Sequence, residues 1–186
     1  DSFMMMVSSP KSESPIIYPA FMNTSQGYWH LRCLKCGELT MRSCDVHNLQ
    51  FECELLEHNV KRLIQGSERL ICPKCKHEHV YSNCREMNIN GGFVHVVPEL
   101  VGKKTGFQWG ALASQWESLS WSYIAEKQLI AGRSGDVKDQ TNFDNSIRGL
   151  PFRPRRDNED TKEALLKHCS EPPDPATVEA LFLTAD

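Results

Sequence analysis

Two short cysteine pairs constrain the fold of this chain more than any other feature of its sequence. Each pair has the form Cys-x-x-Cys, and the four residues are Cys33, Cys36, Cys72 and Cys75. Such a pair places two sulfur atoms on one tight turn, and four thiolates from two turns form a tetrahedral ligand set for zinc. We therefore expect these four cysteines to bind one structural Zn2+ ion.

The residues beside the pairs favour the same interpretation. Gly37 directly follows the first pair and permits the backbone conformation that such a turn often needs. Pro73 stiffens the second turn. The 35 residues between Cys36 and Cys72 are enough for an additional hairpin. Because protein sulfur fills all four coordination positions, we expect a structural rather than a catalytic metal.

Disulfide bonds and redox chemistry are the two alternatives for these cysteines. The first residues carry no basic region and no cleavage pattern of a secretory signal, so we expect a reducing compartment in which paired cysteines bind metal. A thioredoxin-like Cys-x-x-Cys usually stands alone at the start of a helix that follows a strand. A redox role would expose Cys33 and Cys72 to rapid alkylation, whereas metal binding would suppress it.

Four further cysteines remain, namely Cys44, Cys53, Cys84 and Cys169. Cys44 and Cys53 could replace a ligand or bind a second ion together with nearby histidines. These histidines are His47, His58, His77 and His79. We favour the simpler interpretation that the cysteines are shielded free thiols and the histidines lie at the surface. The alternation of His77 and His79 predicts a strand with both imidazoles on one side.

Composition sets the class of protein. With 186 residues, 40% of them hydrophobic and 24% charged, the chain suits one globular domain or two small ones. A net charge of −3 argues weakly against general binding of nucleic acid, although one basic face would suffice for phosphate contacts. No run approaches the roughly 20 apolar residues of a membrane-spanning helix.

Local patterns predict an α+β fold. We expect a strand over residues 2–7, irregular chain over 11–28 and a strand over 93–97. Trp116, Leu119, Tyr123, Lys127 and Ile130 recur at helical spacing and predict a helix over 116–131. We expect a second helix over 137–147 that ends at Gly149, a short helix over 161–168, and a last strand over 180–186 that ends on Asp186.

The order of these motifs resembles the large terminase subunit of lambda-like tailed bacteriophages. The matching stretches are 4–10, 29–37, 72–75, 106–112 with Trp116, 143–151 and 181–186. In that family an ATP-driven motor packages double-stranded DNA, and an RNase H-like nuclease cuts it. The resemblance covers nearly the whole chain and depends more on order and spacing than on any one motif.

The resemblance implies a role for each part of the chain. Residues 1–27 would be the C-terminal edge of the ATPase domain, and Ser8 and Ser9 would form the turn that couples hydrolysis to movement. A zinc-ribbon-like module over 28–100 would follow, then a strand and helical segment over 101–150 that returns to the ATPase domain, and a linker over 151–178. The first nuclease strand, 179–186, would present Asp186 as a ligand of the catalytic divalent metal.

The resemblance also implies partners and a location. These are double-stranded DNA, the small terminase subunit, the capsid portal, further copies of the same subunit, and the host cytoplasm without a membrane. The chain has no Gly-x-x-x-x-Gly-Lys-Ser/Thr loop, so ATP and Mg2+ would bind only in a longer parent protein. We expect both termini to be cuts and this segment alone to hydrolyse neither ATP nor DNA.

A different class of function stays open. A stand-alone zinc-ribbon module that binds nucleic acid or a protein partner, without enzymatic activity, would explain the cysteines equally well. Basic residues near the pairs could contact phosphates: they are Arg32, Lys35, Arg42, Lys74 and Lys76. Because acidic residues lie among them in the sequence, we favour a solvated face of mixed charge.

Overall fold

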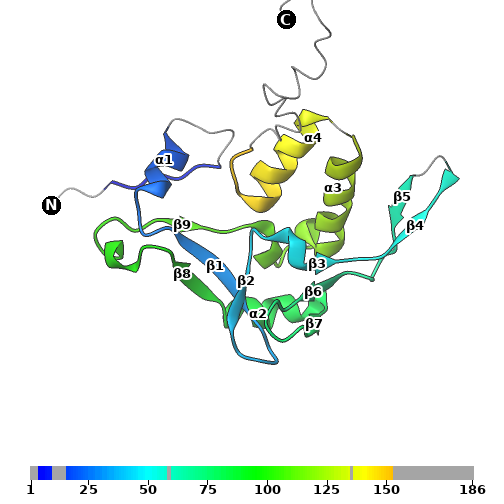
Figure 1. The fold of residues 1–186 in the computed structure, drawn as a ribbon, viewed down its shortest axis with the longest axis horizontal. Coiled ribbons are helices and arrows are strands. Elements are labelled where there is room, and N and C mark those ends of the chain that lie inside the picture. The colour runs from blue at the N-terminus through cyan, green and yellow to red at the C-terminus, as the bar shows by residue number, and fades with distance from the viewer. Residues whose placement is uncertain (1–3, 10–15, 58–59, 135, 153–186) are drawn as a thin grey trace, which may run out of the picture. The chain divides into compact units, whose positions relative to one another are not determined.

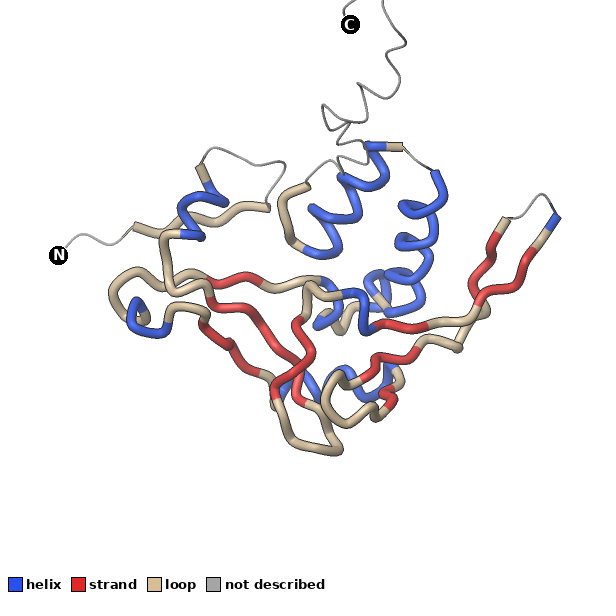
Figure 2. Tube along the Cα trace, in the orientation of Figure 1, coloured by secondary structure: helices blue, strands red, loops and turns tan. Residues whose placement is uncertain are grey.

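The computed structural model describes residues 4–9, 16–57, 60–134 and 136–152 (Figure 1). All of them belong to the first of two units into which the chain divides, Asp1–Arg153. This unit contains both helices and short strands, and the strands pair mostly antiparallel (Figure 2). The described structure therefore confirms the α+β prediction.

Strand β1 (Gly27–Arg32) is the centre of the largest sheet. It pairs antiparallel with β2 (Leu39–Arg42) and with β8 (Gly92–His95), and its first residues pair in parallel with β9 (Phe107–Gln108). The predicted strand over 93–97 thus exists, but it begins one residue earlier and ends at His95.

A second sheet joins β3 (Leu49–Gln50), β6 (Arg69–Ile71) and β7 (Glu78–His79) in that spatial order. Strands β4 (Cys53–Leu55) and β5 (Lys61–Leu63) form a separate antiparallel hairpin, which projects at the right of Figure 1. This hairpin lies within the long segment between the two cysteine pairs, where the sequence left room for one.

Four α-helices complete the described unit. They are α1 (Ile17–Met22), α2 (Cys84–Ile89), α3 (Trp121–Ser134) and α4 (Val137–Asn142), and α4 continues into the π-helical turn η7 (Phe143–Arg148). Short 3-10 turns lie at Val46–Asn48 (η1), Tyr81–Asn83 (η3), Pro98–Leu100 (η4), Ala111–Ala113 (η5) and Glu117–Leu119 (η6). Within the described ranges, no helix is both long and apolar enough to cross a bilayer.

Helix α3 differs from its prediction in its start and in its buried face. It begins at Trp121 instead of residue 116, and Trp116 is 73% exposed. The buried positions are Trp121, Ile124, Ala125 and Ala131. Trp121 fixes this orientation because its buried indole donates a hydrogen bond of 3.1 Å to the carbonyl of Leu112.

The second predicted helix is confirmed as α4 together with η7. It ends where the sequence indicated, because Gly149 adopts a left-handed conformation with φ of 64°.

The N-terminal predictions are wrong for the residues that the structure describes. Residues 4–9 form no strand, and no described strand pairs with them. The side chains of Met4, Met5 and Val7 are exposed. Helix α1 lies in a stretch for which irregular chain was expected. The predicted helix over 161–168 and strand over 180–186 lie outside the described residues.

One hydrophobic core connects the sheets, α2, α3 and the cysteine pairs. Its fully buried members include Leu31, Leu70 and Trp121 as well as Cys33 and Cys72. The cysteine pairs are therefore part of the main core and not an appendage to it.

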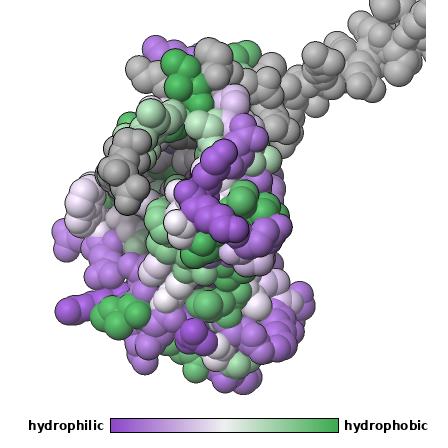
Figure 3. All heavy atoms as spheres, turned by 90° about the vertical axis from the view of Figure 1, so that its left-hand side faces the viewer, coloured by the Kyte–Doolittle hydropathy of each residue, from purple (hydrophilic) through white to green (hydrophobic). Residues whose placement is uncertain are grey.

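The part of the largest sheet formed by β8 and β9 is less buried than the rest. Phe93, Phe107 and Trp109 lie in ring contact there, and Phe107 and Trp109 stay largely exposed. Figure 3 shows apolar and polar residues interleaved on the side of the molecule that faces left in Figure 1.

Candidate metal centre

The first cysteine turn connects β1 to β2. The amide of Cys33 donates to the carbonyl of Glu38 at 3.0 Å, and the amide of Gly37 donates to the carbonyl of Cys33 at 2.9 Å. The amides of Lys35 and Cys36 point at the sulfur of Cys33 and favour its ionised form. This is the tight turn that the sequence predicted.

The second turn connects β6 to β7 and has the same backbone pattern. The amide of Cys72 donates to the carbonyl of His77 at 2.9 Å, and the amide of Lys76 donates to the carbonyl of Cys72 at 2.9 Å. The amides of Lys74 and Cys75 favour the thiolate of Cys72. We refer to the turns 33–38 and 72–77 as the first and second knuckle.

The two knuckles bring their sulfurs together. The Sγ atoms of Cys33, Cys36, Cys72 and Cys75 all lie within 4.8 Å of one another. Two of the separations between knuckles are 3.6 Å, from Cys33 to Cys75, and 3.8 Å, from Cys36 to Cys72. A tetrahedron of sulfurs around zinc, with Zn–S bonds of about 2.3 Å, has edges of about 3.8 Å. The sulfur positions therefore fit one tetrahedral cation.

Burial divides the four thiols into two kinds. Cys33 and Cys72 are fully buried, whereas Cys36 and Cys75 are partly exposed. Each knuckle thus contributes one sulfur from the core and one from nearer the surface.

The electrostatics of the cluster differ between the two buried thiols. Burial raises the pKa of Cys33 to about 12, and the neighbouring thiols of Cys36 and Cys75 add to this. Burial also opposes ionisation of Cys72, but hydrogen bonds from the backbone of Cys75 and Lys74 and from Thr40 outweigh it and lower the pKa to about 6. Several thiolates at these separations would repel one another. A divalent cation removes that repulsion, so the donor set suits a metal ion.

The other cysteines do not build a second site. In the part of the chain that the structure describes, no other group of three or more histidine, cysteine or acidic side chains is arranged to hold a metal. Cys44 and Cys84 are buried free thiols, and burial raises the pKa of both, that of Cys84 to about 11. Cys53 is a partly buried free thiol, and Cys169 lies outside the described residues.

The histidine prediction is confirmed in one respect and wrong in another. The rings of His77 and His79 lie on the same side of the chain, with centroids 4.7 Å apart. His79, however, is 1% exposed and not a surface residue. Its Nε2 atom lies 3.3 Å from the Sγ of Cys33.

Several basic residues near the knuckles already have partners within the chain. Lys74 forms an ion pair with Glu38. The guanidinium of Arg32 donates to the carbonyls of Asn90 and Gly37. Arg42 lies over the ring of Tyr28, 4.0 Å from its centroid. The Lys74–Glu38 pair places opposite charges beside the knuckles, whereas Arg32 and Arg42 contact uncharged groups.

The remaining predicted site residues, Ser8, Ser9 and Asp186, are not part of this cluster. Ser8 and Ser9 are in an exposed stretch without regular structure, and the hydroxyl of Ser8 donates to the carbonyl of Ser9 at 3.0 Å. Asp186 lies outside the described residues. The roles that the resemblance implies for these three residues stay predictions.

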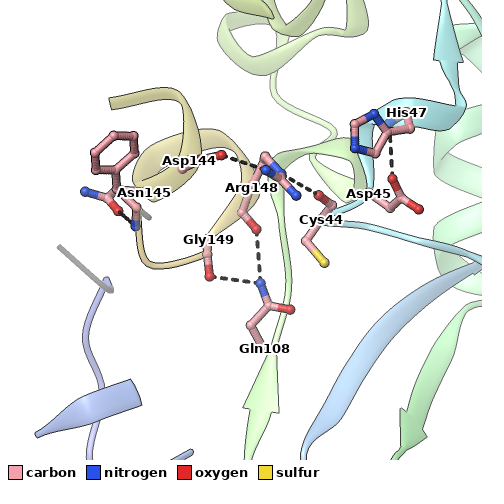
Figure 4. A network of polar contacts seen from close by, with 9 residues as sticks. Cys44, Asp45, His47, Gln108, Asp144, Asn145, Arg148 and Gly149 are labelled. Carbon is pink, nitrogen blue, oxygen red and sulfur yellow. Dashed lines mark hydrogen bonds and ion pairs between the residues drawn. The ribbon is translucent and has the colours of Figure 1, made fainter. Parts of the chain in front are cut away.

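A polar network that the sequence did not indicate joins three distant segments (Figure 4). The amide of Gln108 donates to the carbonyls of Arg148 and Gly149, at 3.0 and 2.9 Å. Arg148 in turn forms an ion pair with Asp144 at 2.7 Å and donates to the carbonyl of Cys44 at 3.3 Å. The network therefore fastens the end of η7 to β9 and to the chain after β2.

No protein-family model, curated protein or solved structure matches this chain. A functional assignment therefore rests on the geometry of the cysteine cluster and on the order of the sequence motifs.

Proposed function

We propose that Cys33, Cys36, Cys72 and Cys75 bind one structural zinc ion that joins the two knuckles. The observation that carries this proposal is the position of the four Sγ atoms, which all lie within 4.8 Å of one another, with separations between the knuckles of 3.6 and 3.8 Å for two pairs. Four thiolates in a tetrahedron are typical of zinc, which has no redox chemistry of its own. All positions are taken by protein, so the ion stabilises the fold and does not act on a substrate.

The proposed ion stabilises the core from within. Cys33 and Cys72 belong to the same buried cluster as Leu31 and Leu70, on the central and the second sheet. Structural zinc sites contribute on the order of 10 kcal/mol to folding at neutral pH. A cation between the knuckles would thus hold together two small sheets that bury few large side chains each.

Metal analysis of purified variants tests the zinc proposal. Single Cys→Ser changes at Cys33, Cys36, Cys72 or Cys75 should each lower the bound zinc well below one equivalent. Cys53→Ser is the matched control, since Cys53 is a partly buried free thiol outside the cluster. Full zinc occupancy after loss of two of the four cysteines would overturn the assignment. Rapid alkylation of native Cys33 and Cys72 would favour the redox alternative instead.

We further propose that the zinc-stabilised unit is a central segment of a terminase large subunit, the DNA-packaging motor of a tailed bacteriophage. The order of motifs supports this, and so does the packing of the stretches that carry the resemblance. Gln108, in the Gly-Phe stretch, donates to Arg148 and Gly149 in the closing stretch. The two stretches 106–112 and 143–151, far apart in the sequence, therefore contact each other directly.

The complete reading frame tests the motor proposal. A Gly-x-x-x-x-Gly-Lys-Ser/Thr loop encoded upstream, and further nuclease carboxylates encoded downstream, would support it. The parent protein should then hydrolyse ATP and cut double-stranded DNA, while this segment alone should do neither. A start codon directly before Asp1 and no such loop would favour the stand-alone zinc module.

A further inference from the structure

The two knuckles are followed by a matching pair of polar residues. Thr40 is the seventh residue after Cys33, and His79 is the seventh residue after Cys72. Thr40 lies on β2 and His79 on β7, the strands that leave the first and the second knuckle. The two positions are thus equivalent in the two halves of the site.

Each of these residues contacts the sulfur of the opposite knuckle. The hydroxyl Oγ1 of Thr40 lies 3.4 Å from the Sγ of Cys72, and the Nε2 of His79 lies 3.3 Å from the Sγ of Cys33. Both distances suit hydrogen bonds to sulfur, which are longer than those to oxygen. The contacts are reciprocal, so each half of the site supplies a donor for the other.

The contacted sulfurs are the two buried ones. Cys33 and Cys72 are 0% exposed, so their thiolates would receive no hydrogen bond from solvent. A metal-bound thiolate carries no proton and can only accept. Thr40 then donates its hydroxyl proton, and His79 donates from Nε2. Cys36 and Cys75, in contrast, are partly exposed residues.

We propose that Thr40 and His79 are positioning residues of the metal centre, each orienting the buried thiolate of the opposite knuckle. This inference rests on the proposed zinc site and adds to it two residues that are not ligands. Groups that hydrogen-bond to metal ligands typically change metal affinity by about 10-fold to 100-fold when they are removed. The reciprocal arrangement makes the two halves of the site depend on each other.

Cobalt titration of the full chain tests this inference, because tetrahedral Co2+–thiolate complexes absorb visible and near-ultraviolet light. Thr40→Val keeps the shape of the side chain and removes its donor, and His79→Phe keeps a ring without the N–H. Each change should weaken Co2+ and Zn2+ binding about 10-fold. The controls are Thr141→Val on the exposed side of α4 and His47→Phe at an exposed position, which should bind as the wild type does.

The charge-transfer band supplies a readout that a purely structural role would not move. A hydrogen bond stabilises the sulfur lone pairs, so its loss should shift the thiolate-to-cobalt band to longer wavelength. Thr40→Ser, which retains the hydroxyl, should restore both the affinity and the wavelength of the wild type. Far-ultraviolet circular dichroism of the metal-loaded variants checks that their secondary structure is intact.

The outcomes separate the two proposals. A wild-type chain that binds no Co2+ or Zn2+ would remove the metal centre and with it this inference. Tight binding by the wild type, with unchanged affinity and band position in Thr40→Val and His79→Phe, would overturn the role of Thr40 and His79 alone. A loss that Thr40→Ser does not restore would also count against the hydrogen bond at Thr40.

Discussion

Gly37 and Lys76 occupy the same position in the two knuckles, and both have a left-handed backbone. Each directly follows the second cysteine of its pair, and their φ angles are 73° and 59°. Only glycine adopts this conformation without a steric cost, which for other residues is roughly 1–2 kcal/mol. The second knuckle therefore carries a strain that the first does not.

Gly37→Ala and Lys76→Gly should change the free energy of unfolding in opposite directions. Gly37→Ala should destabilise the metal-loaded chain by about 1 kcal/mol, because of its backbone conformation alone. An added Cβ at Gly37 would meet no atom within 4 Å. Lys76→Gly should stabilise the chain by about 0.5 kcal/mol, less than the full strain because glycine also gains entropy on unfolding.

Urea denaturation with zinc in excess measures both changes. Lys35→Gly is the control, since Lys35 is not among the positive-φ residues of the described ranges, and it should destabilise. If Lys76→Gly destabilised the chain as much as Lys35→Gly does, the strain at Lys76 would be disproved.

Removal of the metal should unfold much of the described unit. A strong zinc chelator should lower the melting temperature by about 20 °C or more, since the proposed ion contributes several kcal/mol to a core shared by Cys33 and Cys72. Circular dichroism melts with and without chelator measure this, and added zinc should restore the original curve. A variant with all four ligands changed to serine should not respond. Identical melts of the wild type with and without chelator would contradict a structural metal.

Gly149 should tolerate no side chain, in contrast to Gly132 on α3. Gly149 has φ of 64°, and an added Cβ would lie 2.7 Å from the carbonyl oxygen of Trp109. We expect Gly149→Ala to destabilise the chain by about 2–3 kcal/mol and to loosen the Gln108 contacts. Gly132→Ala adds a Cβ in open space within a helix, and should stabilise by about 0.5–1 kcal/mol. If Gly149→Ala and Gly132→Ala changed the melting temperature equally, the left-handed conformation of Gly149 would not be needed to end η7.

Cys84 should make the folded chain sensitive to alkaline pH. Burial raises the pKa of its thiol from 9.0 to about 11, and the sulfur lies 3.5 Å from the carbonyl oxygens of Leu112 and Ser114. The folded state therefore holds the proton more tightly than the unfolded state. The resulting stability is present below pH 9 and is lost as the pH rises from about 9 to about 11.

Urea denaturation at pH 7 and pH 10 measures the contribution of the Cys84 thiol to the free energy of unfolding. Between pH 7 and pH 10, the free energy of unfolding of the wild type should fall by about 1 kcal/mol more than that of Cys84→Ala. Cys53→Ala, which removes a partly buried free thiol, serves as the matched variant and should behave as the wild type. An equal pH dependence in wild type and Cys84→Ala would show that this thiol ionises freely in the folded chain.

The cysteine cluster was accessible to sequence reasoning because its chemistry is local. The ligand type, the Cys-x-x-Cys spacing and the turn residue Gly37 all lie within single knuckles. Gly149 and the helix before it were predicted for the same reason, since a left-handed glycine ends a helix through its own backbone.

Other features were not accessible, because they depend on which segments pack together. The helical pattern predicted from the sequence began at Trp116, whereas the face of α3 that is buried carries Trp121, which donates a hydrogen bond to Leu112. The apolar residues 4–7 suggested a strand, but a strand exists only where another strand pairs with it, and none of those described does.

The sequence by itself therefore determined which four cysteines cluster, the tight turns that carry them and the end of the second helix. Only the tertiary structure decided that the knuckles meet inside the main core and that Thr40 and His79 reach the opposite sulfurs. The physical reason is range: the conformation of a turn follows from a few neighbouring residues, whereas contacts such as that from His79 to Cys33 depend on how the two sheets pack against each other.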